Sequence, residues 1–297
     1  MKKQLTKRNR GARIAAVAFL SVCTVLTLFP MLLLIAGSFT SESALIKSGY
    51  TIIPKEFSLD AYRYLAQKFS SVGRAYLVTI GTSVVGTTLS LILTTSIAYP
   101  MSRTTFKYRN VLAFLVYFTM LFNGGIVPAY IMWTKVFDIK NTFAALIVPN
   151  LLMNAFNVLL VRNFYKSGIP VALYESAEID GASELMIFLR ITLPLAIPVV
   201  STVALFTALT YWNSWVNAMY YLTDPKYFGI QNYLMRIMKN IEFLRNNTDT
   251  GDESVVMLPG QSIRMAIAVI GILPITVIYP FVQKYFIKGI VVGAVKG

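Results

Sequence analysis

The sequence Glu175-Ser176-Ala177-Glu178-Ile179-Asp180-Gly181, followed after nine residues by Ile191-Thr192-Leu193-Pro194, decides how the rest of the chain is organised. It lies between two long apolar segments and holds four of the chain's 13 acidic residues, Glu175, Glu178, Asp180 and Glu184. Charged side chains at this density are too costly to bury in hydrocarbon. Pro170 suits a first helical position, and Gly181 is placed to end a helix. The stretch therefore predicts a short helix outside the bilayer.

The composition indicates a polytopic membrane protein. Of the 297 residues, 56% are hydrophobic, which is too apolar for an ordinary soluble domain. The chain contains no histidine, so chemistry that needs an imidazole is excluded. It also lacks the G-x-x-x-x-G-K-[ST] phosphate loop, so ATP hydrolysis must come from another subunit. Its single cysteine, Cys23, can form no internal disulfide.

Six apolar segments approach the roughly 20 residues that a membrane helix requires. The first follows six basic residues in the stretch 1–13, and it is too long for a secretory signal, so we expect it to stay as the first spanning helix. Asn123-Gly124-Gly125, followed by Pro128, predicts a break or kink in the third segment. The predicted fold is all-α with spans at 14–36, 75–98, 111–133, 142–161, 193–216 and 263–282.

The distribution of charge predicts the orientation. The side of the membrane that holds the N-terminus carries 15 basic and four acidic residues, whereas the longer loops of the other side carry 12 basic and nine acidic. Basic residues concentrate in cytoplasmic loops. Both termini and the segment 165–194 are therefore expected in the cytoplasm. The net charge of +14 is explained by membrane topology and needs no nucleic acid.

Two loops are expected on the extracytoplasmic side. The loop 37–74 is predicted to be partly helical and to pack on the membrane surface. The loop 222–260 contains apolar residues at helical spacing, which predicts an amphipathic helix at the outer interface. A polar stretch follows, Asn246-Asn247-Thr248-Asp249-Thr250-Gly251-Asp252-Glu253.

The pattern E-x-A-x3-G-x9-I-x-L-P resembles the cytoplasmic "EAA" loop of permease subunits in binding-protein-dependent ABC importers. The resemblance implies a type I importer permease fold, with a permease core at 75–297. In that family the loop docks as a coupling helix into a groove of a separate ATPase subunit. Carried over, Glu175 makes a charged contact, Ala177 permits close approach and Gly181 turns the chain. The same loop includes Ser176, where the family usually has alanine, together with Glu178 and Asp180.

Other segments indicate the branch of the family. Phe122-Asn123-Gly124-Gly125-Ile126-Val127-Pro128, Tyr211-Trp212-Asn213-Ser214-Trp215 and the ending 289–297 resemble carbohydrate-uptake permeases, more narrowly the LplC-type and similar oligosaccharide permeases. The ending is similar to a glycine-rich tail that reaches between the ATPase subunits, which implies a coupling role for Lys296 and Gly297. Its alternative is a small-residue packing motif formed by Gly289 and Gly293.

The resemblance also implies the partners and the location. A second homologous permease, a pair of ATPase subunits that bind ATP and Mg²⁺, and an extracytoplasmic solute-binding lipoprotein would complete a complex in the bacterial cytoplasmic membrane. This chain would itself hold no cofactor or metal and would not be an enzyme. In carbohydrate importers of the family, the loop before the last helix can reach the binding protein. Here that implies contact through Asp249, Gly251, Asp252 and Glu253, and a solvated connector is the alternative.

The sugar pathway is expected to be lined by neutral groups, because no charged residue falls near the middle of a predicted span. Amides can bond sugar hydroxyls, and aromatic rings can cover the apolar faces of sugar rings. Asn213 and Asn217 are expected on one helix face. Asparagines that join helices and aromatics of an interfacial belt are the alternative readings. The candidates are Asn123, Asn154, Asn157, Trp212, Asn213, Trp215 and Asn217.

Three other classes compete with a sugar permease. An ABC permease for peptides, phosphate or polyamines keeps the same fold and changes the cargo. An ion-coupled secondary transporter would need buried carboxylates and an inverted repeat, which are not evident in the sequence. A membrane enzyme would need catalytic groups, and the spans contain no histidine and no clustered acids.

Overall fold

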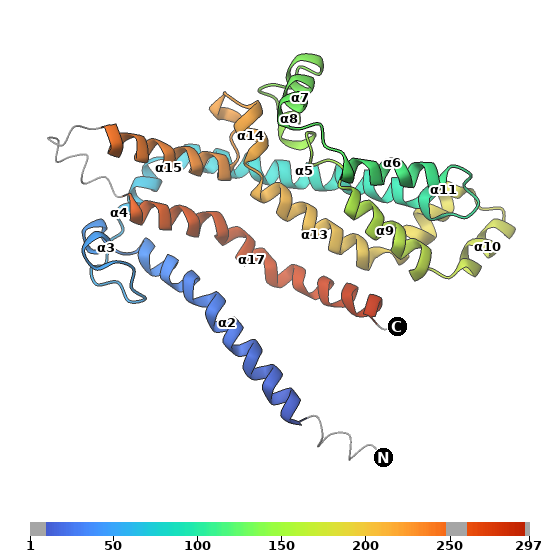
Figure 1. The fold of residues 1–297 in the computed structure, drawn as a ribbon, viewed down its shortest axis with the longest axis horizontal. Helices are drawn as coiled ribbons and strands as arrows, with labels where there is room; N and C mark the ends of the chain where they lie inside the picture. Colours follow the sequence, from blue (N-terminus) through green and yellow to red (C-terminus); the bar gives the residue numbers. More distant parts are fainter. Residues whose placement is uncertain (1–9, 248–259, 295–297) are drawn as a thin grey trace. The chain divides into compact units, whose positions relative to one another are not determined.

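The computed structural model describes residues 10–247 and 260–294, and these residues form helices joined by turns and loops (Figure 1). Within the described ranges there is no β-strand, only an isolated bridge between Thr40 and Phe57. The contacts divide the described chain into two compact units. One consists of 10–69 with 236–247 and 260–274, and the other consists of 70–235 with 275–294.

The first unit begins with a long apolar helix and two short helices, α2 (Arg10–Ser38), α3 (Glu42–Ser48) and α4 (Asp60–Gln67). The apolar side chains of α2 are largely exposed, as those of Phe19 and Leu26 illustrate, and lipid is the environment that suits them. The two short helices confirm the prediction that the loop 37–74 is partly helical. The predicted first span, 14–36, lies wholly within α2.

Hydrogen bonds tie this segment to the start of the last helix, α17 (Gln261–Ala294). The carboxylate of Glu42 accepts from the backbone N–H groups of Gln261 and Ser262, at 2.9 and 3.0 Å, and from the Ser262 hydroxyl. The first N–H groups of a helix have no partner within the helix, and a carboxylate there also suits the helix dipole. The Glu42 side chain therefore caps α17.

The second unit contains the remaining helices. It begins with α5, the longest of its helices, and continues through a series of shorter and bent ones. Their bounds are α5 (Phe69–Ser102), α6 (Arg109–Leu121), α7 (Ile126–Ile131), η1 (Met132–Val136), α8 (Ala144–Ile147), α9 (Ala155–Gly168), α10 (Val171–Ile179), α11 (Glu184–Ile187), η2 (Phe188–Thr192), α12 (Leu193–Leu195), α13 (Ile197–Asn213), α14 (Val216–Tyr221) and η3 (Pro225–Tyr227). The helix α15 (Ile230–Asn247) begins in this unit and ends in the first.

Two helices in the described part of the chain are long and apolar enough to cross a membrane, Arg13–Ser38 and Phe69–Ser102. Two bent pairs also pass this test, one joining Arg109–Leu121 to Ile126–Val136 and the other joining Glu184–Leu195 to Ile197–Asn213. The candidate spans among these residues therefore number up to four when each bent pair counts as one.

The first bent pair confirms the predicted break at Asn123-Gly124-Gly125. The two helices meet at 112°, and Gly125 has a φ of 86°, a conformation that favours glycine. The side-chain oxygen of Asn123 accepts a hydrogen bond from the Gly125 N–H at 2.8 Å, which closes the turn. The break is thus built from local turn chemistry.

Two predicted spans differ from the observed helices. The segment 142–161 is not one continuous helix, because the four-residue α8 ends before Pro149, which lacks an N–H, and Asn150, which has a φ of 60°. The chain becomes helical again at α9. The predicted fifth span, 193–216, is bent by 78° near Ala196 and ends at Asn213.

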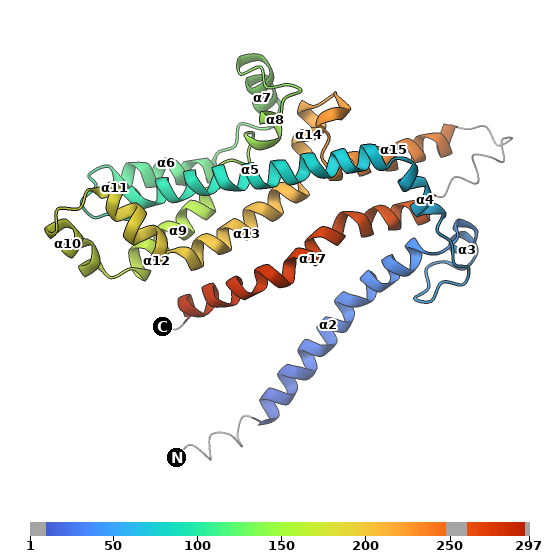
Figure 2. The same cartoon turned by 180° about the vertical axis from the view of Figure 1, so that it is seen from behind.

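The core of the second unit gathers around one end of α5, where α10, α11 and α12 also lie (Figures 1 and 2). Its members come from α5, α6, α9, α10, α11 and α13 and from the turns beside them. The short α10 and α11 contribute buried side chains, so they are part of this core. The buried residues are Ala98, Tyr99, Met101, Val116, Ala155, Val158, Val161, Tyr165, Ile169, Tyr174, Ala177, Ile187, Ala196, Val199 and Val203.

The predicted amphipathic segment of the loop 222–260 forms the helix α15. Its buried residues recur at helical spacing at Ile230, Leu234, Ile237 and Ile241, which confirms the amphipathic pattern. The first of these donates its backbone N–H to the hydroxyl of Thr79 at 2.8 Å. Its position at an outer membrane interface stays a prediction.

Candidate functional site

The helix α10 carries the central motif of the sequence. Pro170 precedes it as the N-cap residue, and the helix runs from Val171 to Ile179. Gly181 has a φ of 77°, and two backbone bonds close the end of the helix: Gly181 N–H to Glu178 O at 3.0 Å, and Ala182 N–H to Ala177 O at 2.9 Å. This pair of bonds is the Schellman arrangement. The predicted short helix and its glycine stop are confirmed.

The inward face of α10 is formed by Tyr174 and Ala177, three residues apart. Both are buried, at 5% and 7% exposed, and both belong to the core of the second unit. Residues three apart share one face of a helix. The small side chain of Ala177 therefore lets α10 approach this subunit's own core. The close approach to an ATPase subunit that the resemblance implies for Ala177 stays a prediction.

The outward face of α10 holds the other predicted coupling residues. Glu175, Ser176, Asp180 and Gly181 are exposed, and Ile179 is 86% exposed. Other large apolar side chains on α10 and after the turn are also exposed: Val171, Leu173, Leu185, Met186 and Leu189. A group of exposed apolar side chains rimmed by polar groups is typical of a surface that contacts another protein or a membrane.

The chain after α10 continues as a bent helix. Ser183 caps α11, its hydroxyl accepting from the Met186 N–H at 3.4 Å. A π-helical turn, η2, follows, and the hydroxyl of the buried Thr192 donates to the Ile187 carbonyl at 3.3 Å. The I-x-L-P part of the motif thus lies in η2 and α12, directly before the 78° bend into α13.

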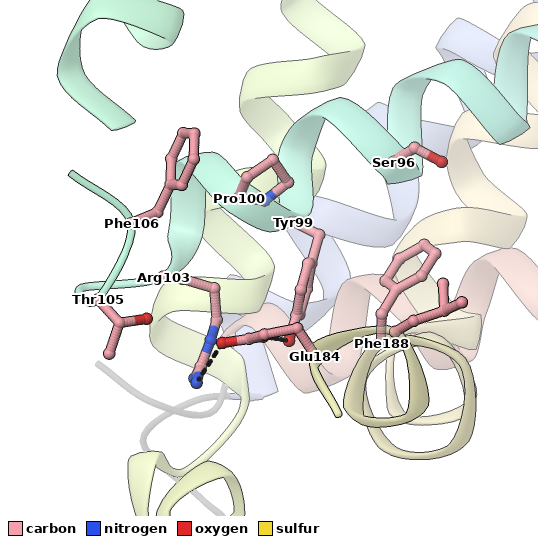
Figure 3. A pocket seen from close by; sticks show the side chains of 9 residues that line it. Ser96, Tyr99, Pro100, Arg103, Thr105, Phe106, Glu184 and Phe188 are labelled. Carbon is pink, nitrogen blue, oxygen red and sulfur yellow. Dashed lines mark hydrogen bonds and ion pairs between the residues drawn. The ribbon is translucent and has the colours of Figure 1, made fainter. Parts of the chain in front are cut away.

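A cluster of charged and aromatic side chains joins α10 and α11 to the end of α5. Figure 3 shows three of its members, Tyr99, Arg103 and Glu184. Arg103 is the first residue after the end of α5. Its side chain is only 8% exposed and forms ion pairs with Glu178 and Glu184. The second ion pair measures 3.5 Å from Nη2 to Oε1. The hydroxyl of Tyr99 donates to the other carboxylate oxygen of Glu184. Buried charges require partners of this kind.

Aromatic rings surround the Arg103 guanidinium. Its Cζ lies 4.3 Å from the ring centre of Tyr174 and 6.0 Å from that of Tyr99, within the range of cation–π attraction. Burial raises the pKa of Tyr174 above its ordinary value, and the Arg103 cation acts in the opposite direction. Tyr174 therefore stays an uncharged phenol at neutral pH.

The same cluster borders a cavity of about 560 Å³. Most of its wall is apolar, and Arg103 and Glu184 are the charged residues among those that line it (Figure 3). The lining residues come from the end of α5, the turn after it, α11 and η2, and they are Ser96, Tyr99, Pro100, Arg103, Thr105, Phe106, Glu184, Leu185 and Phe188.

Sequence reasoning missed Arg103, Tyr99 and Tyr174 as members of this site. Arg103 enters the charge count only as one of the 15 basic residues on the N-terminal side, and its partners lie 75 and 81 residues further along the chain. One signal was available: Arg103 directly follows a long apolar segment, and the predicted topology places it on the same side as a loop with four acids. Charge complementarity between those two loops would have suggested a pair.

Three of the predicted pathway residues have structural partners. Asn157 is buried, and its amide donates to the Thr207 hydroxyl at 3.4 Å, between α9 and α13. Asn217 is buried and donates to the Pro149 carbonyl at 2.8 Å. Trp212 is 7% exposed, and its ring lies 6.3 Å from that of Tyr76. These contacts agree with the alternative interpretation, in which such residues link helices to one another.

The remaining pathway candidates are accessible. Asn123 lies in the break between α6 and α7, and Asn154 caps α9 by accepting from the Asn157 N–H at 3.1 Å. Asn213 is exposed and donates to the Leu209 carbonyl at 3.0 Å, while Trp215 is half-buried.

The expectation that Asn213 and Asn217 share one helix face is wrong. The helix α13 ends at Asn213, and α14 begins at Val216 after a non-helical Ser214. The first asparagine is exposed and the second is buried. Helical spacing predicts a shared face only where the helix is continuous.

Some predicted residues fall outside the described part of the chain. These are the tail residues Lys296 and Gly297, and the binding-protein contacts Asp249, Gly251, Asp252 and Glu253. Their roles stay predictions.

Comparison with known proteins supports the resemblance found in the sequence. Residues 86–292 match the family model described as binding-protein-dependent transport system inner membrane component. The chain is 40% identical to Protein LplC of Bacillus subtilis (strain 168) over 292 residues, covering 98% of this chain and 97% of that protein. It is 38% identical to the polygalacturonan/rhamnogalacturonan transport system permease protein YtcP of the same organism, covering 98% and 100%.

A solved structure has a similar fold. It is the crystal structure of a bacterial ABC transporter involved in the import of the acidic polysaccharide alginate, with a TM-score of 0.77 and 27% sequence identity, covering 94% of this chain and 98% of that chain. The family model spans more than half of the sequence, and the relatives match nearly all of it. This chain therefore belongs to the family of inner-membrane components of binding-protein-dependent transport systems, and it is a transport permease subunit, not an enzyme.

Proposed function

We propose that this chain is one of two permease subunits of an ATP-driven importer of oligosaccharides. The assignment of the cargo rests on the cargo named for two similar proteins. One is a permease for polygalacturonan and rhamnogalacturonan at 38% identity, and the other is an importer of alginate at 27%. All three cargoes are carbohydrate polymers. The proposed topology has six crossings with both termini in the cytoplasm, in line with the excess of basic residues on that side.

The helix α10 is the proposed contact with the ATPase. Its inner face is anchored in the subunit core by Tyr174 and Ala177, and its outer face presents Glu175 beside exposed apolar groups such as Ile179. A helix with one face fixed in its own subunit and the other apolar and acidic is suited to dock into a groove of another protein. The ATP and Mg²⁺ would be bound by the partner ATPase subunits.

The core around α10 supplies the means to transmit movement. The buried side chains of α10 and α11 pack with those of α5, α6, α9 and α13 in one close-packed cluster. Because protein interiors have few voids and low compressibility, such a cluster moves as a body. Closure of the ATPases on ATP would displace α10, the spans would follow and open the pathway outward, and hydrolysis would reset them.

The sugar-binding part of the pathway is assigned to accessible neutral groups. Asn123, Asn154, Asn213 and Trp215 keep this proposed role, since they are exposed or half-buried. Asn157, Asn217 and Trp212 instead hold helices together. A second permease, a solute-binding lipoprotein and membrane lipid complete the proposed complex.

Reconstitution in liposomes tests the cargo. The complex, copurified with its second permease, ATPase and binding protein, would be assayed for ATP hydrolysis against neutral oligosaccharides, oligosaccharides of uronic acids, peptides and polyamines. We expect stimulation by one class of oligosaccharide. Stimulation by peptides or polyamines alone would contradict the sugar assignment, and copurification without an ATPase would contradict the assembly.

A matched pair of surface variants tests the docking face. Ile179→Asp places a charge on the outer face of α10, where the side chain is 86% exposed, so we expect the subunit to fold but to lose its ATPase during purification. Ile53→Asp makes the same change at a side chain that is 80% exposed in the segment after α3. Retention of the ATPase by the Ile179 variant, or its loss from both, would contradict the docking role.

A further inference from the structure

Arg103 forms ion pairs between the end of α5 and the loop 165–194. It follows Ser102, the last residue of α5, and its side chain is 8% exposed. Its two carboxylate partners both come from the loop, Glu178 on α10 and Glu184 on α11. A buried guanidinium without such partners would carry an uncompensated charge. The arginine therefore binds two helices of the loop at once.

The aromatic neighbours restrict where the guanidinium can lie. The Tyr174 ring, which belongs to α10, is 4.3 Å from its Cζ. The Tyr99 ring of α5 lies at 6.0 Å, and Figure 3 shows it beside Arg103. Tyr99 also donates its hydroxyl to Glu184. Tyr99 and Arg103 thus both reach α11 through hydrogen bonds to the Glu184 carboxylate, one from a neutral hydroxyl and one from a cation.

The other contacts of α10 and α11 with the subunit are of a different kind. Tyr174, Ala177 and Ile187 are buried in the apolar core. Apolar packing is non-directional, whereas hydrogen bonds between ionised groups have a defined geometry and are about twice as strong as neutral ones. The ion pairs of Arg103 therefore add a directional contact between α10 and the end of α5 to the close packing of the core.

We propose that Arg103 is a positioning residue that fixes the coupling helix α10 to the end of α5, so that a displacement of α10 is passed directly to this membrane helix. The inference rests on the proposed coupling role of α10. It assigns Glu178 to a contact inside the subunit and leaves the exposed Glu175 as the acid of α10 available to the ATPase.

The test measures uptake and ATP hydrolysis together in the reconstituted complex. In Arg103→Gln and in Glu178→Gln we expect the amount of sugar taken up per ATP hydrolysed to fall at least about fivefold, the lower end of typical coupling between sites. A purely structural role would reduce the quantity of assembled complex and leave this ratio unchanged. An unchanged ratio in both variants would overturn the inference.

A double-mutant cycle asks whether the two side chains act as one unit. If Arg103 and Glu178 act only through their ion pair, the variant carrying both changes should have a ratio close to that of Arg103→Gln alone. If the fold-loss of this ratio in the double variant equals the product of the losses in the two single variants, the side chains act independently, and the proposal is overturned. Should Arg103→Gln fail to assemble, Glu178→Gln and Glu184→Gln carry the test, since those side chains are 41% and 55% exposed.

Two further variants complete the design. Arg103→Lys keeps the charge but loses the planar guanidinium. Its ratio of uptake to hydrolysis should therefore lie between those of Arg103→Gln and the wild type. Arg190→Gln removes an exposed arginine from the same loop, one without an ion-pair partner among the described residues, and should keep the wild-type ratio. A wild-type complex that hydrolyses ATP without taking up any sugar would refute the proposed function and this inference with it. A wild-type complex that takes up sugar as it hydrolyses ATP, together with variants whose ratio is unchanged, would refute this inference alone.

Discussion

The backbone N–H of Ala182 donates to the carbonyl of Ala177 at 2.9 Å, across the left-handed turn at Gly181. This bond reverses the chain at the end of α10 and directs it into α11. Ala177 is buried in the core of the second unit, so the turn starts from a fixed point. The spacing of alanine and glycine in the central motif is thus explained by the geometry of a helix end.

Replacing Gly181 by alanine should destabilise this turn. A side chain at a φ of 77° costs about 1–2 kcal/mol. Gly73→Ala, in the helix α5 where a Cβ meets no atom within 4 Å, should instead be neutral or slightly stabilising. Thermal unfolding of the purified complex would measure both. Equal stability of the two variants would contradict the role of the turn.

Ala177→Asp should prevent assembly. The residue is 7% exposed in the subunit's own core, and an unpaired carboxylate there should cost about 3 kcal/mol or more. Ser176→Asp places the same charge on the neighbouring, exposed position and should leave the subunit folded. The yield of folded permease subunit after detergent extraction is the measurement, because Ser176 lies on the proposed docking face. A normal yield of the Ala177 variant would show that this face is not packed internally.

Gly86→Ala should loosen the contact between α5 and α13. A Cβ at Gly86 would fall on the ring of Tyr211, which is 3% exposed and held by a hydrogen bond of 3.0 Å to the Ile147 carbonyl. Overpacking of this kind costs about 1–3 kcal/mol. At Gly81 on the same helix a Cβ would make ordinary contact with Phe143 at 3.4 Å, so Gly81→Ala is the control. Thermal unfolding of the purified complex should separate the two, and equal stability would refute the close packing.

Asn217→Leu should lower the stability of the complex, whereas Asn213→Leu should lower its affinity for sugar. Loss of the Asn217 amide leaves the Pro149 carbonyl without its 2.8 Å partner, at a cost of about 1–3 kcal/mol of stability. Asn213 is exposed, so its replacement should spare stability and lower the affinity for sugar, seen as a raised KM for uptake. Both quantities can be measured on the same proteoliposomes. A raised KM in the Asn217 variant alone would reverse the pathway assignment.

The sequence by itself determined the elements whose causes are local. The short helix α10 and its stop follow from Pro170 and Gly181, and the break between α6 and α7 follows from Asn123-Gly124-Gly125. The long apolar helices follow from composition, and the family follows from the motif at 175–194. Each of these depends on backbone preferences or hydrophobicity within a few neighbouring residues.

Only the tertiary structure decided which residues face inward and which residues from distant segments meet. It divided the acids of the motif into Glu178 and Glu184, which bind Arg103, and Glu175, which is exposed. It also separated Asn213 from Asn217 by ending a helix between them. The physical reason is that an ion pair between residues 75 positions apart depends on how α5, α10 and α11 pack, and local sequence preferences do not contain that information.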